Sequence, residues 1–212
     1  MSSGPDANLP EVMNSEPIRR RHRLITRPMI VDTARRLFRE EGYRGTTLEM
    51  VAAELGVTRA ALYHWVENKE SLLCEIHDEA LDRLVGRFQA IQEADLPPGD
   101  KLAEAIRNHL LIVAGNLDAI AVFFQDEASL PEEPARRITR RKRDYDHALE
   151  ALVRAAQAEG TVRADLDPRV TVEMLFGMCN SLYHWYQPDG RIRPKELADE
   201  VLEMVFGGLR PR

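Results

Sequence analysis

The stretch that decides the fold is TTLEMVAAELGVTRAALYHW, residues 46–65. Thr46 followed three residues later by Glu49 is the pattern of a capping box, which predicts a short helix directly after it. Gly56 predicts the end of that helix, and Thr58 predicts the N-cap of a second short helix. Two short helices joined through a glycine turn predict a helix-turn-helix.

Helical periodicity continues on both sides of this stretch. Before it, Pro28 and a stripe of apolar residues predict an amphipathic helix that ends at Gly42. After it, Asn68 predicts the N-cap of a long helix reaching about residue 92. Apolar spacing and Pro or Gly breaks predict five more helices, at 100–115, 117–130, 134–159, 167–186 and 194–208. The sequence therefore predicts an all-α fold of about nine helices.

Length and charge narrow the class of protein. The chain has 212 residues, enough for a small domain followed by a larger one. Its net charge of -6 is uneven: residues 1–17 carry 3 acids and no base (-3), residues 18–70 carry 11 Lys and Arg against 7 Asp and Glu (+4), and residues 71–212 carry 18 against 25 (-7). A basic segment around the helix-turn-helix favours a localised surface for a polyanion such as DNA.

Several other classes of protein are disfavoured. Cys74 and Cys179 lie too far apart in the sequence to suggest a disulfide framework or a zinc finger. Cys74 and His77, with a distant His109, are a weak metal set, so we expect no metal and no other cofactor. No secretory or membrane-spanning segment is recognisable, which favours a cytoplasmic protein without a membrane partner. No nucleophile elbow, phosphate loop or dinucleotide motif is present, so an enzyme is not expected.

Four segments together resemble the DNA-binding domain of the TetR family of transcriptional regulators: ARRLFREEGYRGTT (34–47), VAAELGVT (51–58), ALYHW (61–65) and NKESL (68–72). The family usually has Phe where this chain has Trp65, and we expect Trp65 to fill the domain core in its place. The resemblance implies a homodimer that binds a palindromic DNA operator, usually represses, and is released by a small molecule. It implies three regions: a disordered, basic-ended arm (1–22), the DNA-binding domain (23–83) and a ligand-binding and dimerisation domain (84–212).

A recognition helix brings its N-terminal side chains to base edges in the major groove. Thr58, Arg59 and Ala60 have the size and hydrogen-bonding groups for that position, while the side chains one turn later are suited to phosphates. The free amides at the start of the preceding helix provide a further phosphate contact. The same positions carry the family's DNA contacts, so the predicted DNA-binding residues are Thr46, Thr47, Thr58, Arg59, Ala60, Tyr63, His64 and Lys69.

The last two predicted helices are apolar around more than one face, as expected for helices packed on a core and on a partner. In the resembled family these helices pair with those of a second copy as a four-helix bundle. The residues predicted for the dimer interface are Val172, Leu175, Cys179, Leu182, Val201 and Val205.

Aromatic and flexible side chains in the C-terminal part predict a ligand pocket, although each of them is also an ordinary core residue. The predicted walls and polar anchors are Phe123, Phe124, Met174, Met178, Asn180, Tyr183, His184 and Trp185. The stretch NSLYHWYQPDG, residues 180–190, resembles a TetR branch that senses CoA thioesters in fatty-acid or steroid catabolism. The basic run 136–143 then either meets the phosphates of CoA or is a solvated helix face.

Two alternatives remain open at this point. One is a TetR-type repressor of an efflux or stress gene that senses an aromatic or drug-like ligand. The other is a helix-turn-helix protein that organises DNA without any ligand, which a closed C-terminal core would favour.

Overall fold

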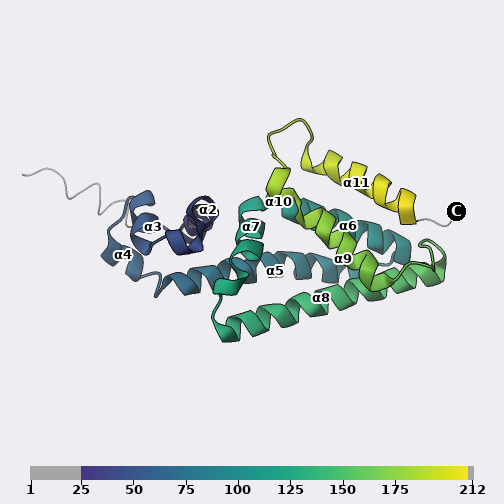
Figure 1. Cartoon of the computed structure of the whole chain (residues 1–212), viewed down its shortest axis with the longest axis horizontal. Helices are drawn as coiled ribbons and strands as arrows, with labels where there is room; N and C mark the ends of the chain where they lie inside the picture. Colours follow the sequence, from purple (N-terminus) through teal and green to yellow (C-terminus); the bar gives the residue numbers. More distant parts are fainter. Residues whose placement is uncertain (1–24, 210–212) are drawn as a thin grey trace, which may run out of the picture.

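The computed structural model describes residues 25–209, which form an elongated, all-helical molecule (Figure 1). The predicted arm, residues 1–22, lies outside the described residues. At one end of the molecule lie α2 (Arg27–Gly45), α3 (Leu48–Glu54) and α4 (Arg59–Tyr63), and α5 (Lys69–Glu93) runs from them along most of its length. The remaining helices are α6 (Pro98–Gly115), α7 (Leu117–Gln125), α8 (Glu132–Glu159), α9 (Pro168–Asn180), α10 (Leu182–Trp185) and α11 (Pro194–Leu209), with a 3-10 turn at Glu127–Ser129.

Two hydrophobic clusters hold these helices together, and α5 contributes to both. The first cluster joins α2, α3, α4 and the first half of α5, and it also takes in Phe123 of α7 and Ile138 of α8. The second cluster begins at Phe88 of α5 and contains the buried faces of α6, α8, α9 and α11. Because α7 and α8 pack into the first cluster, the small N-terminal domain and the larger C-terminal part share an apolar boundary.

Glycines set two of the bends around the helix-turn-helix. Gly56 has a φ of 66°, in the left-handed region, at the turn between α3 and α4. Gly42 has a φ of 74° and interrupts α2, whose last turn then continues to Gly45. The predicted end of the first helix is therefore a kink followed by one more short turn.

The predicted capping box is wrong by one residue. Thr47, rather than Thr46, is the N-cap of α3, and its hydroxyl accepts a hydrogen bond from the amide of Met50 at 3.3 Å. The Thr46 side chain is buried, and its hydroxyl donates to the carbonyl oxygens of Leu37 (3.1 Å) and Gly42 (2.9 Å). Thr46 thereby fixes the end of α2 against the start of α3.

Three further expectations need correction. The Trp65 side chain is 42% exposed, so it does not fill the domain core; Leu62, fully buried one turn earlier, does. The helix predicted for 167–186 is divided at Ser181 into α9 and α10. The helix predicted for 117–130 ends at Gln125.

Among residues 25–209, no single helix has both the length and the apolar composition needed to cross a membrane. Only α6 and α7 taken together pass that test, across a bend of 92°.

Candidate DNA-binding surface and ligand cavity

The exposed side of α4 carries most of the side chains predicted to meet DNA. Thr58 caps the helix by accepting a hydrogen bond from the amide of Ala61 at 3.2 Å. The predicted DNA-binding residues that are exposed on this side and at the start of α3 are Thr47, Thr58, Arg59, Ala60, Tyr63 and His64. This arrangement leaves one face of the helix-turn-helix open to a groove of DNA.

Arg59 is held by two partners in the absence of DNA. Its Nη1 lies 2.8 Å from Oε1 of Glu49 on α3, and its Nη2 donates to the Tyr63 hydroxyl at 3.2 Å. The guanidinium carbon also lies 5.2 Å from the centre of the Tyr63 ring. Glu49 was predicted as part of a capping box, and its ion pair with Arg59 depends on how α3 and α4 pack together.

Two of the predicted DNA contacts serve the fold instead. Thr46 is buried and both its hydroxyl contacts are internal, so its side chain is withdrawn from the DNA surface. The Lys69 ammonium donates to the carbonyl oxygens of Tyr43 (2.7 Å) and Thr46 (2.8 Å), and it lies 4.3 Å from the centre of the Tyr43 ring. Lys69 thus ties the start of α5 to the end of α2, and only its third N–H is left for a phosphate.

A cavity of about 350 Å³ opens between α5, α6, α7, α8 and α9. Its walls are mainly apolar, with a few polar groups, as is typical of small-molecule sites. The lining residues are Ala80, Leu81, Leu84, His109, Ile120, Phe123, Phe124, Lys142, Tyr145, Asp146, Glu173, Phe176, Gly177 and Asn180.

A hydrogen-bonded triad, made of the buried His109 and Tyr145 and the half-buried Asn180, forms the polar part of this cavity. His109 of α6 lies 3.2 Å from the Tyr145 hydroxyl through Nδ1 and 2.9 Å from Oδ1 of Asn180 through Nε2. Because the Asn180 oxygen can only accept, Nε2 carries the proton and Nδ1 accepts from Tyr145. Burial lowers the pKa of His109 to about 4, so the imidazole is neutral at physiological pH. The ring of Phe176 stacks on His109.

Acidic side chains outnumber basic ones in the cavity wall, with Asp146 and Glu173 against Lys142. Burial, and then the neighbouring Glu173, raise the pKa of Asp146. Lys142 is the cation of the cavity wall, and it is 3.0 Å from Glu127 at both carboxylate oxygens. It also lies 5.3 Å from the centre of the Phe123 ring. The positive charge of Lys142 is therefore already neutralised.

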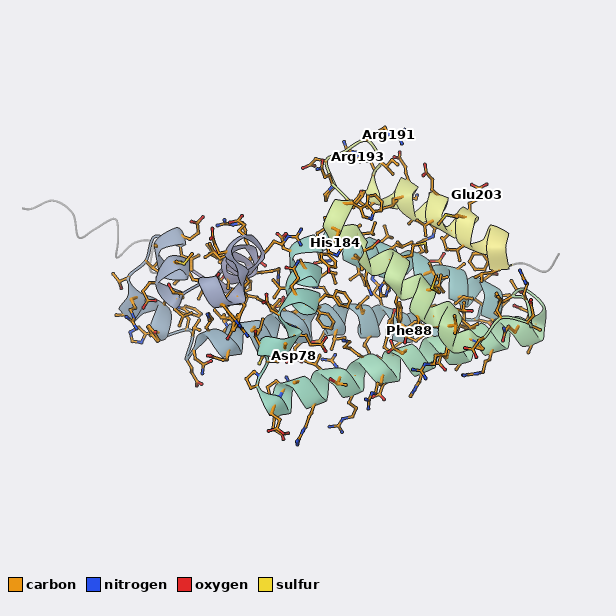
Figure 2. The ribbon with its side chains drawn as sticks, viewed as in Figure 1. Asp78, Phe88, His184, Arg191, Arg193 and Glu203 are labelled. Carbon is orange, nitrogen blue, oxygen red and sulfur yellow. The ribbon has the colours of Figure 1, made fainter. Side chains whose placement is uncertain are left out.

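The structure brings only some of the predicted ligand residues together. Phe123, Phe124 and Asn180 line the cavity. Tyr183 and Met178 do not line the cavity; the Tyr183 ring stacks on Phe124, and Met178 is half-buried against the second hydrophobic cluster. The other three were wrongly placed in the pocket, because they are exposed on the outside of α9 and α10: Met174, His184 and Trp185 (His184 is labelled in Figure 2).

The sequence analysis missed most of the polar residues of the cavity. His109, Tyr145, Asp146 and Glu173 come from three different helices, and no spacing in the sequence relates them. The sequence offers one signal for this polar group: His109 lies on the apolar stripe of α6. It was predicted only as a member of a weak metal set. Among the described residues, no three metal-ligating side chains lie close enough to hold an ion.

The predicted dimer residues mostly face inward. Val172, Leu175, Cys179 and Leu182 are buried within the chain's own second cluster, so they cannot form the interface as predicted. Val201 and Val205 are half-buried against the same cluster. The apolar side chains that are exposed on α9 and α11 are Val170, Met174 and Met204. Glu203, the neighbour of Met204 in the chain, points away from the core (Figure 2).

The basic run on α8 is mainly paired with acids of the chain. Arg137 and Arg141 form ion pairs with Asp78 of α5, which is labelled in Figure 2 near the start of α8. Arg140 and Arg143 are exposed and make no ion pair within the described part of the chain. The run therefore clamps α8 to α5 and presents two free cations to solvent.

An exposed helix-turn-helix joined through one long helix to a helical domain with a cavity defines a one-component DNA-binding regulator. Comparison with known proteins agrees with this class. Residues 30–76 match the family described as bacterial regulatory proteins of the tetR family, and residues 95–209 match the tetracyclin repressor-like C-terminal domain. The chain belongs to the TetR family of transcriptional regulators, as the sequence resemblance predicted.

Proteins similar in sequence include a transcriptional repressor and a regulator of fatty acid metabolism. The transcriptional repressor KstR2 of Rhodococcus jostii (strain RHA1) is 26% identical over 185 residues, covering 86% of this chain and 90% of that protein. The fatty acid metabolism regulator protein of Bacillus subtilis (strain 168) is 23% identical, with 85% and 93% covered.

Solved structures share the fold. KstR2 of Mycobacterium tuberculosis, a ketosteroid transcriptional regulator, aligns with a TM-score of 0.83 at 21% identity, covering 88% of this chain and 95% of that one. AibR in complex with isovaleryl coenzyme A and operator DNA aligns with a TM-score of 0.73 at 31% identity, covering 88% and 98%.

Proposed function

We propose that this chain is a homodimeric repressor that releases its operator when a CoA thioester enters the cavity. The observation that carries the proposal is the chemistry of the cavity: apolar walls, a neutral polar triad and no unpaired cation. The likeness to AibR, which has been crystallised with isovaleryl coenzyme A and operator DNA, supports the same class of ligand.

The polar triad is suited to a carbonyl group. Oδ1 of Asn180 accepts a hydrogen bond from His109, whereas Nδ2 of Asn180 makes no hydrogen bond among the described residues. An amide N–H that is left free in an apolar cavity favours a ligand with an uncharged acceptor. A thioester carbonyl meets this requirement, and the acyl chain attached to it can pack against Leu84, Ile120 and Phe176.

A free carboxylic acid fits the cavity less well. Asp146 and Glu173 would repel a carboxylate, and Lys142 is already paired with Glu127. The phosphates of CoA would remain outside, where Arg140 and Arg143 offer unpaired positive charge on the solvent side of α8. In the proposed complex, the uncharged acyl end of the CoA thioester lies inside the cavity and its anionic phosphates lie in solvent.

Dimerisation follows from the surface that the monomer leaves apolar. Large apolar side chains that a monomer leaves exposed favour a contact with another molecule. We infer that the exposed face of α9 and α11, with Val170, Met174 and Met204, meets the same face of a second copy. Two helix-turn-helix units can then read two half-sites of a palindrome.

The remaining expectations complete the proposed function. The regulator acts in the cytoplasm, where operator DNA is found, and binding rather than catalysis is its whole activity. Residues 23–83 bind DNA, and residues 84–212 bind the second copy and, together with Ala80 and Leu81 of α5, the ligand. The junction proposed at residue 83 falls inside α5, so one continuous helix can carry a displacement from the cavity to α4.

The test begins by selecting operator DNA from a random duplex pool with the full-length protein. Release of that DNA is then measured with isovaleryl-CoA, longer acyl-CoA esters, the matched free acids and CoA alone. We expect release by at least one ester and none by its free acid. Asn180→Ala should weaken the response to the ester while leaving operator affinity unchanged, and Gln187→Ala on the exposed loop serves as the matched control.

The acids of the cavity favour a second candidate function. A hydrophobic cation of the drug-like class would be attracted by Asp146 and Glu173 and could stack on Phe124 and Phe176. Release by an aromatic cation, and by no CoA ester, would replace the first proposal with a repressor of an efflux or stress gene. Operator binding that no ligand of either class affects would instead indicate a DNA-organising protein.

A further inference from the structure

We propose that Glu49 determines the DNA specificity of this regulator as a positioning residue, by holding Arg59 in the orientation that reads a single base pair. The inference rests on the DNA binding of the helix-turn-helix. It goes further by assigning sequence discrimination to an acidic side chain on a surface that must approach phosphates.

The geometry fixes the Arg59 guanidinium from two sides. Nη1 of Arg59 lies 2.8 Å from Oε1 of Glu49 on α3. Its Nη2 donates to the hydroxyl of Tyr63, one turn along α4, at 3.2 Å. The guanidinium also lies over the Tyr63 ring, 5.2 Å from its centre. Since a guanidinium has five N–H donors in a rigid plane, three of them stay free at a defined angle. A long, mobile side chain is thus oriented before DNA arrives.

The charge of Glu49 makes contact with the wrong sequence costly. In the free protein the exposed ion pair contributes little to stability. When the surface enters a groove, water leaves and the carboxylate comes close to the phosphates, so binding loses free energy unless the pair gains new partners. A guanine offers Arg59 two acceptors, O6 and N7, and compensates for that loss, whereas other bases at this position do not.

The local structure keeps Glu49 ionised. A hydrogen bond from its own backbone N–H in the first turn of α3 lowers its pKa, and the nearby Arg59 lowers it further. Both interactions favour the ionised form of the Glu49 carboxyl group.

Glu54 provides a matched control on the same helix. Its side chain is 50% exposed against 49% for Glu49, and it also forms an ion pair with an arginine, Arg36 of α2. Glu49→Gln and Glu54→Gln each remove one negative charge from α3. Only the first substitution releases the arginine that is expected to reach a base.

The experiment measures Kd for the selected operator, for operators with each base pair changed in turn, and for random duplex DNA at fixed salt. Glu49→Gln should increase affinity for random DNA by about tenfold and reduce discrimination by about tenfold at one base pair. That base pair should be the one at which Arg59→Ala also loses discrimination. Glu54→Gln should leave the pattern of discrimination unchanged.

A double-mutant cycle separates positioning from simple charge repulsion. In an Arg59→Ala background, Glu49→Gln should no longer alter discrimination at any base pair. Glu49→Asp keeps the charge and the first-turn position but shortens the reach to Arg59, so it should lose discrimination at the same base pair as Glu49→Gln without gaining affinity for random DNA. If Glu49 had only a structural role, its substitution would change the melting temperature and would change the affinity for all DNA sequences equally, without an effect confined to one base pair.

Three outcomes would contradict the role of Glu49 or the DNA-binding function itself. If the parent protein selects an operator and Glu49→Gln discriminates among base pairs as the parent does, the role of Glu49 is wrong. If Glu49→Gln still changes base-pair discrimination in the Arg59→Ala background, positioning of Arg59 is also excluded. If the parent protein selects no operator at all, the DNA-binding function itself fails.

Discussion

The guanidinium of Arg39 donates a hydrogen bond to the backbone carbonyl oxygen of Tyr183, with 2.8 Å between Nη2 and the oxygen. Arg39 lies on α2 of the DNA-binding domain, and Tyr183 lies on α10, 144 positions later in the chain. The Tyr183 ring in turn stacks on Phe124, with an angle of 12° between the two planes, and Phe124 lines the cavity. A ligand that moves Phe124 therefore acts on Tyr183, and Tyr183 is in direct contact with Arg39 of the DNA-binding domain.

Arg39→Ala should uncouple the ligand from DNA. The substitution removes a polar link between the two domains, so we expect operator affinity without ligand to change by less than about threefold, while release by an active CoA ester weakens by about tenfold, near the middle of the usual range of allosteric coupling. Titration of operator complexes with the ester measures both quantities. Arg36→Ala is the control, because Arg36 pairs with Glu40 and Glu54 inside the DNA-binding domain. Equal release of the parent and Arg39→Ala would show that this link carries no signal.

Lys69→Ala should destabilise the DNA-binding domain. It leaves the carbonyl oxygens of Tyr43 and Thr46 without their charged donor, at an expected cost of about 1–3 kcal/mol in the free energy of unfolding. Urea denaturation followed by circular dichroism measures this loss, with Lys195→Ala on the exposed side of α11 as the control. If the third N–H of Lys69 also binds a phosphate, the salt slope of DNA affinity should fall by about 0.9. Unchanged stability would contradict the structural role.

Stability should fall in mild acid because of His109. Its pKa is about 4 in the folded protein against 6.5 for a histidine in an unfolded chain, so below pH 6.5 the unfolded chain binds a proton that the folded chain does not bind. Stability is therefore complete above pH 6.5 and is lost as the pH falls towards 4. Between pH 7 and pH 5, the parent should lose about 2 kcal/mol more than His109→Gln. Denaturation at matched protein concentration compares the two proteins, and parallel losses would exclude His109 as the source.

Met174→Glu should prevent dimerisation. Met174 is 72% exposed in the monomer, so a charge there is tolerated by the fold but would be buried in the proposed interface. We expect a monomer by light scattering at concentrations at which the parent is a dimer, together with an unchanged far-ultraviolet circular dichroism spectrum. Met29→Glu, an exposed methionine on α2, is the control. A dimer of Met174→Glu would place the interface elsewhere.

The all-helical fold and the helix-turn-helix could be predicted because their signals are local. Gly56 allows a left-handed turn, Thr58 caps α4, and Asn68 caps α5 by accepting from the amide of Ser71 at 2.8 Å. Each of these interactions spans only a few residues, so side-chain type and spacing are enough to indicate it. The family followed from the same short motifs.

The functional surfaces were predicted less completely because they depend on which face of a helix meets another helix. Apolar spacing marked α9 and α11 as buried on more than one side, but it did not tell the core face with Leu175 from the outer face with Met174. Similarly, the pairing of Glu49 with Arg59 and the burial of Thr46 depend on the crossing of separate helices.

By itself, the sequence determined the helices, their order, the helix-turn-helix and the TetR family, since caps, turns and periodicity act within one or two helical turns. Tertiary structure alone decided the cavity around His109, Tyr145 and Asn180 and the link from Arg39 to Tyr183. These groups are tens of residues apart in the chain and come together only when helices pack. The physical reason is that hydrophobic burial selects the faces that meet, and the polar contacts form wherever that packing places them.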